Sequence, residues 1–402
     1  MNEPEVTTIT TFAEARDAYR NKALRQALYD EGEVIMSDVI VNLHADQHRS
    51  RRRLENRLFR RDRMEEYEKK RFPAVIEETL TPNVREGHAE LVSVSHQLMM
   101  NLAATTAGID RPEGTPEESF HLYDYLMLFV EGATLAHYTG DREAKAAEVA
   151  EGLQRFDDEF LAPSIERRLA ALAAHRAGDI DPSEVPVDVL CTLLANEDDL
   201  DLPHETIRRE TAYYLLAGAH TSATAFVRTL HRLFEWEAAH PEEAGVLRTD
   251  PLSVQRCMHE TIRLEPSSPV AMRWALDDME LRSGRQIARG SKVVIDLNSV
   301  NRDPEVFGAD ADEFDPHREL PEGVPRWGLS FGLGMHACIG SDLAGGLPYQ
   351  EGDDVDEHLH GLVPVAAQWM LNHGARPDPS DPAEMDSATA RPYWGRYPVR
   401  FG

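Results

Sequence analysis

Apolar residues recur at intervals of three and four along most of this chain, the period of a helix that buries one face. This period predicts helices over residues 11–29, 46–71, 87–107, 119–138, 142–177, 186–196, 203–237 and 251–264. Proline and glycine separate several of them, as in RPEGTPEE, GDIDPSEVP and HPEEAG. Most of the chain is therefore predicted to be helical.

Patterns typical of strands are fewer and come later. Residues 279–300 predict a hairpin with a turn at Ser283 and Gly284, followed by the largely buried strand KVVIDL. We find no low-complexity linker and no internal repeat. The whole pattern predicts an α+β fold that is predominantly α, with a small β region late in the sequence.

Composition agrees with a globular protein, since 42% of the 402 residues are hydrophobic. The sequence contains no run of about 18 apolar residues that would span a bilayer, and MNEPEVTTITTF does not resemble a signal peptide. Three cysteines are too few for a disulfide framework and fit a reducing compartment. These features predict a cytoplasmic protein that is not inserted in a membrane.

The net charge of -29 argues against nucleic acid as a general partner, because phosphates would be repelled over most of the surface. One segment reverses this sign. Residues 48–63, HRSRRRLENRLFRRDR, carry eight arginines. They form either a solvated basic face or a docking site for an acidic partner or an anionic group of a cofactor.

The stretch FGLGMHACIG at residues 331–340 contains the third cysteine in a glycine-rich loop. A zinc site is disfavoured because no second close pair of cysteines or histidines would complete it, and a hydrolase is disfavoured because no Gly-x-Ser-x-Gly occurs. A flat, apolar cofactor would use these residues differently. Cys338 would be its soft axial ligand, the glycines would let the backbone approach the ring, and Phe331 would shield the sulfur.

The pattern F-x-x-G-x-H-x-C-x-G, filled by Phe331, Gly334, His336, Cys338 and Gly340, resembles the haem-binding loop of the cytochrome P450 superfamily. The resemblance implies that Cys338 binds the iron of haem b. It also implies one cytochrome P450 domain over residues 1–402, in which haem lies between a long central helix and the helix of the cysteine loop.

Two more segments agree in the expected order. HETIRLEP at 259–266 resembles the Glu-x-x-Arg helix of the family and supplies Glu260 and Arg263. EFDPHR at 313–318 is similar to the Phe-x-Pro-x-Arg segment, so the resemblance implies that Arg318 completes an ionic triad that holds the cysteine loop. The alternative for Glu260 and Arg263 is an exposed helix pair of little energetic value.

LLAGAHTSATAF at 215–226 resembles the central helix, with Ala217, Gly218 and Thr221 at matching positions. The glycine either makes room for a ligand or permits close helix packing. The residue before the threonine departs from the family, which has an acid where this chain has His220. Because histidine titrates near neutrality, it can relay protons together with Thr221; the alternatives are a substrate hydrogen bond or altered chemistry.

Haem carries two propionates, for which the resemblance indicates His48, Arg52, Arg273 and His336. The remaining arginines between Arg49 and Arg63, Arg51 among them, would then form a basic patch. In this family the cysteine side accepts an electron donor, so we expect an acidic ferredoxin, or a flavodoxin, with its reductase.

The ends of the chain also depart from the family. An extra helix and two strands usually precede the segment that resembles residues 11–28, so we expect a shortened N-terminal region. Beyond the cysteine, Gly345, Gly346 and Pro348 predict a short or broken helix and an atypical segment over 345–362. The acidic stretch at 351–360 is predicted to be an exposed loop.

The resemblance implies a bacterial-type haem-thiolate monooxygenase, which uses O2 and electrons from NAD(P)H delivered by separate redox proteins. Its substrate would be a moderately hydrophobic small molecule of secondary or catabolic metabolism. The site would be lined by the loop before His48 and by residues 122–138, 212–220 and 267–272. Two alternatives stay open: peroxide-driven or redox-neutral chemistry, which His220 motivates, and a non-enzymatic haem binder.

Overall fold

The computed structural model describes residues 5–135, 138–196, 202–350, 352–355, 357–387 and 392–402. They fall into two compact units. Unit 1 comprises Met1–Arg25, Arg61–Leu98 and Thr221–Gly402, and unit 2 comprises Gln26–Arg60 and Met99–His220. That residues 1–402 form a single domain stays a prediction.

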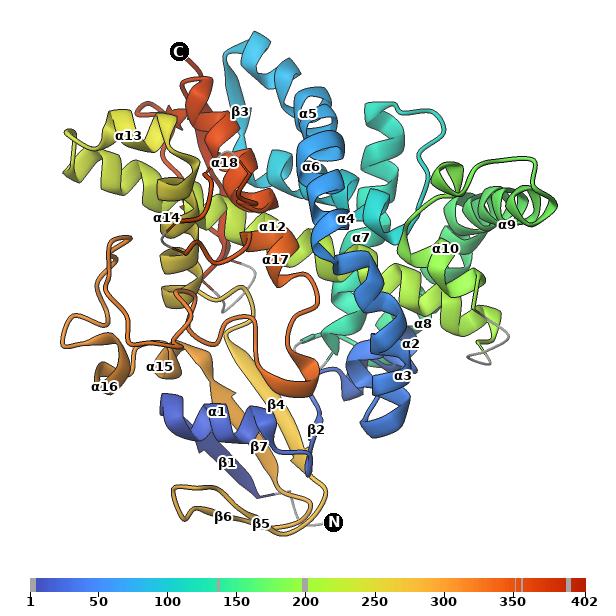
Figure 1. Cartoon of the computed structure of the whole chain (residues 1–402), viewed down its shortest axis with the longest axis horizontal. Coiled ribbons are helices and arrows are strands. Elements are labelled where there is room, and N and C mark those ends of the chain that lie inside the picture. Colours follow the sequence, from blue (N-terminus) through green and yellow to red (C-terminus); the bar gives the residue numbers. More distant parts are fainter. Residues whose placement is uncertain (1–4, 136–137, 197–201, 351, 356, 388–391) are drawn as a thin grey trace. The chain divides into compact units, whose positions relative to one another are not determined.

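Unit 1 holds the sheets and the C-terminal helices (Figure 1). Its strands are β1 (Val6–Ile9), β2 (Leu24–Gln26, at the unit boundary), β3 (His88–Glu90), β4 (Val270–Ala275), β5 (Met279–Glu280), β6 (Gln286–Ile287), β7 (Lys292–Asp296), β8 (Arg376–Pro377), β9 (Glu384–Met385), β10 (Trp394–Arg396) and β11 (Pro398–Arg400). Its helices are α1 (Phe12–Arg20), α4 (Arg61–Glu66), α5 (Phe72–Glu86), α13 (Ala244–Thr249), α14 (Pro251–Leu264), α15 (Leu297–Val300), α16 (Pro304–Phe307), α17 (Ser341–Gly345) and α18 (Leu362–Asn372).

Unit 2 is helical. It contains α2 (Glu33–Met36), α3 (Ala45–Glu55), α7 (Pro116–Ala133), α8 (Arg142–Phe156), α9 (Ala162–Ala177) and α10 (Val189–Leu194). Two helices cross the boundary between the units, α6 (Leu91–Ala107) and α12 (His204–Ala239). The helix-rich chain with small sheets confirms the predicted α+β class.

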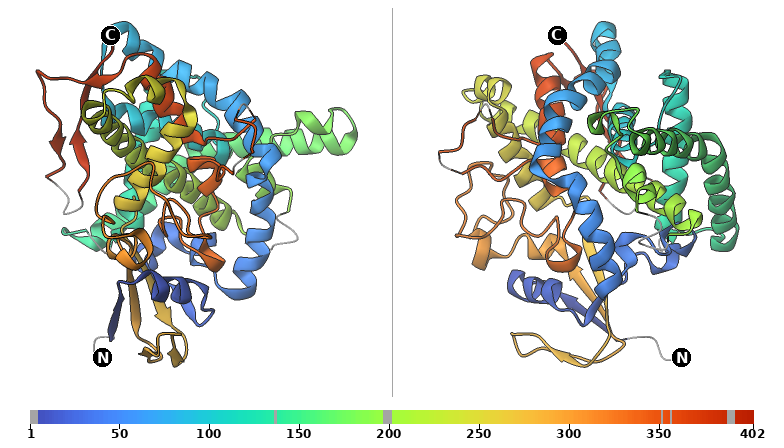
Figure 2. Two further views of the ribbon diagram at one scale, coloured as in Figure 1. Left: turned by 60° about the vertical axis from the view of Figure 1, so that its left-hand side comes forward. Right: turned by 45° about the vertical axis from the view of Figure 1, so that its right-hand side comes forward.

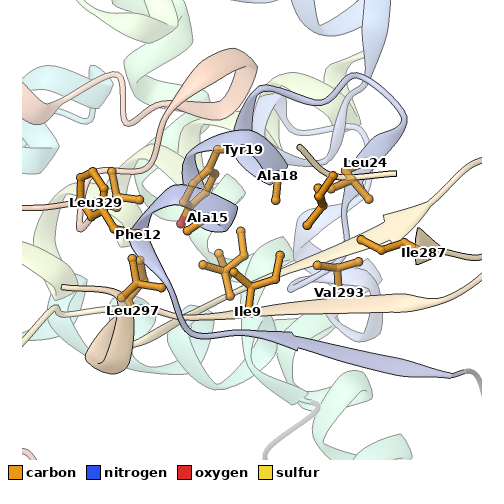
Figure 3. Packing of buried hydrophobic residues seen from close by; sticks show 14 of the residues in the cluster. Ile9, Phe12, Ala15, Ala18, Tyr19, Leu24, Ile287, Val293, Leu297 and Leu329 are labelled. Carbon is orange, nitrogen blue, oxygen red and sulfur yellow. The ribbon is translucent and has the colours of Figure 1, made fainter. Parts of the chain in front are cut away.

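The largest sheet has the strand order β1-β7-β4-β2, in which β1 runs parallel and β4 antiparallel to β7. Helix α1 covers one face of this sheet (Figures 1 and 3). Phe12 and Ala15 of α1 pack with Ile9, Val293 and Leu297 into one buried cluster, shown in Figure 3. Burial of this apolar surface fixes α1, whose last turn reaches the candidate site.

The predicted hairpin is confirmed. Strands β5 and β6 pair antiparallel, and Gly284 between them has φ +88°, a value that favours glycine. Strand β7 comprises KVVID of the predicted strand KVVIDL and is buried at alternate positions, while Leu297 begins α15. Strand β4 beside it was not predicted.

Several predicted helices have different bounds. The helix expected over 11–29 is wrong beyond Arg20, because Leu24–Gln26 forms β2 in the large sheet. The one expected over 142–177 is interrupted by a π-helical turn, Asp157–Leu161, before Pro163. The stretch 87–107 begins with β3, where tertiary strand pairing overrides the helical period.

Other bounds differ at helix ends. Helix α7 ends at Ala133, and residues 136–137 of the range predicted for it lie outside the described residues. Helix α5 was missed, because Pro73 and Pro82 hide its apolar period. The break that Pro348 predicted is present, since α17 has only five residues.

Residues 347–360 form an excursion between two helices whose ends meet. It leaves α17 at Gly346, φ +78°, and returns to α18 at Gly361, φ +87°. A Cβ on Gly361 would lie 2.2 Å from the Gly346 nitrogen, and the Leu347 N–H donates to the Leu359 carbonyl at 2.9 Å. Helix α18 then packs on α14 and α17 (Figures 1 and 2).

The excursion is acidic at its tip and anchored at its base. Asp353, Asp354 and Glu357 are exposed, as predicted for residues 351–360, while residues 351 and 356 lie outside the described residues. The prediction is wrong for residues 358–360, which are buried at the base of the excursion. At the base, the Glu68 carboxylate accepts the N–H groups of His360 and Gly361 at 2.9 and 2.8 Å. The predicted atypical segment is therefore ordered at both ends.

Among the described residues, no helix combines the length and the apolar character that a membrane span requires.

Candidate functional site

The cysteine loop turns on two glycines. Gly332 and Gly334 have φ values of +64° and +70°, and a Cβ on Gly334 would lie 2.4 Å from the Tyr19 carbonyl oxygen. The Cys338 N–H donates to the Phe331 carbonyl at 2.8 Å, which closes the loop. Glycine is therefore required at 334 by the close approach of α1.

Cys338 differs from the other two cysteines in exposure, since its side chain is exposed and theirs are buried. Burial raises the pKa of Cys191 to about 11 and that of Cys257 further still, so both stay protonated thiols at neutral pH. The loop thus carries the exposed thiol among the three cysteines.

Tyr19, at the end of α1, brings Arg273 to the same loop. The guanidinium of Arg273, buried on β4, lies 5.3 Å from the centre of the Tyr19 ring. The ring also faces Gly332, where an added Cβ would lie 3.6 Å from Tyr19 Cε1. Burial raises the pKa of Tyr19 to about 12, so its hydroxyl is neutral. Arg273 therefore supplies the positive charge of this group.

Aromatic rings support the loop from the other side. Phe331 packs edge-on against Trp327 with ring centres 5.5 Å apart, and Trp327 packs in the same way on His259 at 4.9 Å. His259 of α14 contacts the Gly345 carbonyl through Nε2 at 2.7 Å. Since a carbonyl only accepts, Nε2 carries the proton. Helices α14 and α17 are thereby joined directly behind the cysteine loop.

The structure brings the predicted ionic triad together. Arg263 contacts both carboxylate oxygens of Glu260, Nη2 to Oε1 at 2.6 Å and Nε to Oε2 at 2.7 Å. Arg318 Nε donates to the same Oε1 at 3.2 Å. All three side chains are buried, and Arg263 is fully inaccessible. The alternative, in which Glu260 and Arg263 form an exposed helix pair of little energetic value, does not fit this buried geometry.

Asn301 connects the triad to the cysteine loop. Its carbonyl accepts from Arg263 Nη1 at 2.7 Å, and its side-chain oxygen accepts the Leu329 N–H at 2.8 Å. Its amide nitrogen donates to Ser330 Oγ at 2.8 Å, and Ser330 donates to the Ile262 carbonyl at 2.6 Å. The chain entering the loop is therefore hydrogen-bonded to the helix that carries the triad.

Helix α12 carries the predicted distal residues. Among the described residues, Gly218 and Thr221, three residues apart on this helix, are exposed, while Ala219, Ser222 and Ala223 are buried. The 36-residue helix therefore has exposed positions near its centre, at two of the predicted site residues.

Gly218 also serves the alternative role of close packing. A Cβ added to it would lie 3.1 Å from Ala103 Cβ of α6, which supports the close-packing alternative, while its role beside a ligand stays a prediction. Ala217 beside it is half-buried. Where the family has an acid, His220 is half-buried, and Thr221 follows it. The Thr221 carbonyl accepts from Ser267 Oγ at 2.9 Å, which ties the helix to the segment 267–272.

The other residues expected at the propionates lie in different places. His336 is half-buried in the 3₁₀ turn Gly334–His336 of the cysteine loop in unit 1. His48 is buried on α3 of unit 2, where burial, then Arg52 and His44, lower its pKa to about 4, so it is a neutral donor. Arg52 is half-buried and donates to Asn56 Oδ1 at 2.8 Å.

The predicted basic patch needs one correction. Arg51 is buried and pairs with Glu210, Nη1 to Oε2 at 2.8 Å, so its inclusion in an exposed patch is wrong. It lies one turn from His48 and Glu55 on the buried face of α3. The exposed arginines of unit 2 in this segment are Arg49, Arg53, Arg57 and Arg60.

In unit 1, Arg61 and Arg63 pair with neighbouring carboxylates, Glu65 at 3.2 Å and Glu66 at 3.1 Å. Pairing reduces the net positive charge that these two present. In unit 2, Arg49 likewise pairs with Asp46 at 2.9 Å, so the basic character of the segment depends mainly on Arg53, Arg57 and Arg60.

Several known proteins are similar to this chain in sequence or in structure. The family model "Cytochrome P450" matches residues 252–345, which span the triad and the cysteine loop. Solved cytochrome P450 structures superimpose on nearly the whole chain. P450BioI, solved in complex with an acyl carrier protein carrying hexadec-9Z-enoic acid, has a TM-score of 0.73 at 19% identity, over 98% of this chain and 91% of that one. CalO2 has a TM-score of 0.74 at 20% identity, over 98% and 90%.

Residues 252–345 thus match the cytochrome P450 family, and nearly the whole chain has the fold of a solved cytochrome P450.

Sequence relatives match a smaller part of the chain. Cytochrome P450-terp from Pseudomonas sp is 33% identical over 168 residues, which is 41% of this chain and 36% of that protein. Nocardicin C N-oxygenase from Nocardia uniformis subsp. tsuyamanensis is 34% identical over 186 residues, 46% and 42%. The matched part thus spans between a third and a half of the length of these relatives.

The residues of this site fit haem, which the cytochrome P450 family would imply. An exposed sulfur lies in a turn whose glycines admit close approach, and Arg273 is a nearby cation for a carboxylate. Cys338 would hold the iron, with Phe331 beside it. Thr221, which is exposed on α12, would supply a hydroxyl.

Three residues that support the site were not predicted. Tyr19, Trp327 and Asn301 respectively contact Arg273, Phe331 and the chain leading into the cysteine loop. Tyr19 and Asn301 make contacts distant in sequence, which no local spacing marks, whereas Trp327 precedes Phe331 by one helical turn in number and also packs on the distant His259. The signal that could have pointed to such residues was Gly334. A glycine that adopts a positive φ can mark a place where another part of the chain comes close, but it does not identify that neighbour.

Proposed function

We propose that this chain is a haem-thiolate monooxygenase that oxidises a moderately hydrophobic small molecule. The observation that carries the proposal is the exposed Cys338 in a loop held by Asn301 and the Glu260 triad. When bound, haem b supplies O2 activation and the oxidising chemistry. The protein residues place the sulfur, neutralise the propionates and hold or move protons.

Two groups of side chains would do this. Cys338 gives up its proton to become the thiolate ligand, and Arg273, Arg52, His48 and His336 offer N–H groups to carboxylates. Phe331 shields the sulfur from water, and Trp327 fixes its ring. The burial of His48 as a neutral ring favours donation without added charge.

Thr221 and His220 would move protons on the other side. The threonine hydroxyl both donates and accepts, and an imidazole exchanges protons near neutral pH. The hydrogen bond from Ser267 is made to the backbone carbonyl of Thr221 and not to its hydroxyl. Electrons would come from NAD(P)H through a reductase and a ferredoxin or flavodoxin that docks on the exposed arginines of unit 2.

A second candidate is peroxide-driven oxidation, which His220 favours because it replaces an acid. Turnover with isotopically labelled O2 distinguishes these two candidate functions. The proposal expects label in the product when reductase, ferredoxin and NADPH are supplied, and little product with peroxide alone. Product formed only with peroxide would assign the second function.

Variants of α12 test the proton transfer. Thr221→Ala is expected to lower the product formed per O2 consumed by roughly a hundredfold, because general acid–base groups contribute on this scale. Ser222→Ala, a buried neighbour on another face, is the control. If both variants formed the same amount of product per O2 consumed, Thr221 would not have the proposed role.

A further inference from the structure

Unit 2 buries two carboxyl groups in one cluster between α3 and α12. Glu55 and Glu210 are both fully inaccessible. Arg51 Nη1 contacts Glu210 Oε2 at 2.8 Å, and the Tyr214 hydroxyl lies 2.5 Å from Glu55 Oε2. The two acids are close enough for the charge of Glu55 to act on Glu210.

The charges of this cluster do not balance if both acids are ionised. The groups that act on the pair are Arg51, which is buried, Arg52, which is half-buried and bonded to Asn56, and the hydroxyl of Tyr214. One buried cation can compensate one buried carboxylate, and an uncompensated second one is costly. A pair of this kind retains one proton.

Hydrogen bonding indicates which acid is ionised. The Ile40 N–H donates to both oxygens of Glu210, at 3.2 and 3.0 Å, in addition to Arg51. Glu55 has one polar contact, and its Oε1 is buried without a hydrogen-bond partner among the described residues. Burial and the charge of Glu55 raise the pKa of Glu210 as well, but Arg51 and the Ile40 N–H oppose that rise. Because donors stabilise a carboxylate, we infer that Glu210 is the ionised acid and Glu55 the neutral one.

Glu210 joins three segments that carry predicted site residues. Its carboxylate holds Ile40, at the start of the segment that leads to His48, and Arg51, on the helix of His48. Glu210 itself lies on α12, ten residues before His220. Removing its charge would release the backbone at Ile40.

We propose that Glu55 and Glu210 share one proton at neutral pH, and that Glu210, kept ionised by this sharing, is a positioning residue for the segment preceding His48. Its relevance to substrate access rests on the proposed function, because only the resemblance assigns that segment to the pocket. The proton sharing itself does not depend on that function.

The pKa of Glu55 determines how the stability of the protein depends on pH. Burial raises the pKa of Glu55 to about 7, against the opposing effects of Tyr214, Arg51 and Arg52. A raised pKa means that the folded protein binds this proton more tightly than the unfolded chain. The stabilisation is therefore complete below the ordinary value of 4.5 and is lost as the pH rises through about 7.

Infrared spectroscopy of the haem-loaded protein tests the shared proton without any activity assay. We expect a protonated-carboxyl C=O band at about pH 6 that disappears by about pH 9. The band should be lost in Glu55→Gln and kept in Glu205→Gln, an exposed control on α12. Wild-type protein without this band at about pH 6, or Glu55→Gln that retains it, would overturn the proposal.

Hydrogen exchange tests the positioning role. In Glu210→Gln, exchange at the Ile40 amide should be about tenfold faster, because a hydrogen bond to a charged group is replaced by one to a neutral amide. Glu205→Gln should leave it unchanged. Unchanged exchange in folded Glu210→Gln would contradict the positioning role. If that variant does not fold, Glu210→Asp, which keeps the charge but shortens the side chain, takes its place, and unchanged exchange at the Ile40 amide would again contradict the positioning role.

Discussion

Glu260 and Arg263 meet through two contacts of 2.6 and 2.7 Å in a region where Arg263 has no accessible surface. The remaining donors of Arg263 reach the carbonyls of Asn301 and Ala311 at 2.7 Å each. The pair therefore joins α14 to the chain that leads into the cysteine loop. Its function is structural, and its loss should appear first in stability.

Glu260→Gln should lower the free energy of unfolding by about 3–5 kcal/mol, because two buried arginines lose their common counter-charge. Urea titration of the haem-loaded protein measures this. Glu242→Gln is the control, since Glu242 is exposed and should change stability by less than about 0.5 kcal/mol. A loss for Glu260→Gln no larger than that of the control would show that the pair does not stabilise the fold.

The excursion at 347–360 depends on glycine where α17 and α18 meet. Gly361→Ala should destabilise by about 3 kcal/mol or more, because its Cβ would lie 2.2 Å from a backbone nitrogen. Gly352→Ala has a comparable positive φ, +100°, with no atom within 4 Å of the added Cβ, and should cost about 1 kcal/mol. Equal losses of thermal stability would mean that the helix ends do not meet as described.

His259 should make the protein sensitive to acid. Burial lowers its pKa from 6.5 to about 4. The folded state therefore disfavours the protonated ring, and its contribution, about 3 kcal/mol, is present above pH 6.5 and lost as the pH falls toward 4. His259→Gln keeps an N–H for Gly345 but cannot titrate, so its stability should fall less over this range.

The matched control for this pH titration is His88→Gln, because His88 is exposed. It should keep the acid sensitivity of the wild type. If the free energy of unfolding fell equally with pH in His259→Gln and in wild type, His259 would not be the source of the acid sensitivity.

Much of the site was predictable because its residues lie in short motifs. The cysteine loop, the Glu260–Arg263 pair and the α12 segment each need only local spacing, and the structure brings Arg318 to the pair as expected. The hairpin at Gly284 was likewise predictable from its turn. Local chemistry determined these features.

Other features depended on partners distant in sequence. Arg51 was assigned to an exposed patch because its neighbours are arginines, but Glu210, 159 positions away, pairs with it inside unit 2. Residues 24–26 read as helix and form a strand because β4 lies beside them. Tyr19 and Asn301 could not be found for the same reason, since their contacts exist only in the fold.

The exposed arginines of unit 2 should govern the rate of reduction by an acidic donor protein. Arg53→Glu with Arg57→Glu should slow second-order reduction by about tenfold at low salt, and added salt should reduce the difference. Arg142→Glu, exposed on α8, is the control. Stopped-flow reduction by a ferredoxin measures this, and equal rates for both variants would place docking elsewhere.

The ligation of iron by Cys338 is the central claim, and the CO-difference spectrum of the reduced protein tests it most directly. We predict a Soret band shifted to the red in the wild type and in Cys191→Ala, and its loss in Cys338→Ala. Cys191 is the matched control because it is a buried cysteine on α10 of unit 2. A red-shifted band that survives in Cys338→Ala, or that is absent from haem-loaded wild type, would contradict the assignment.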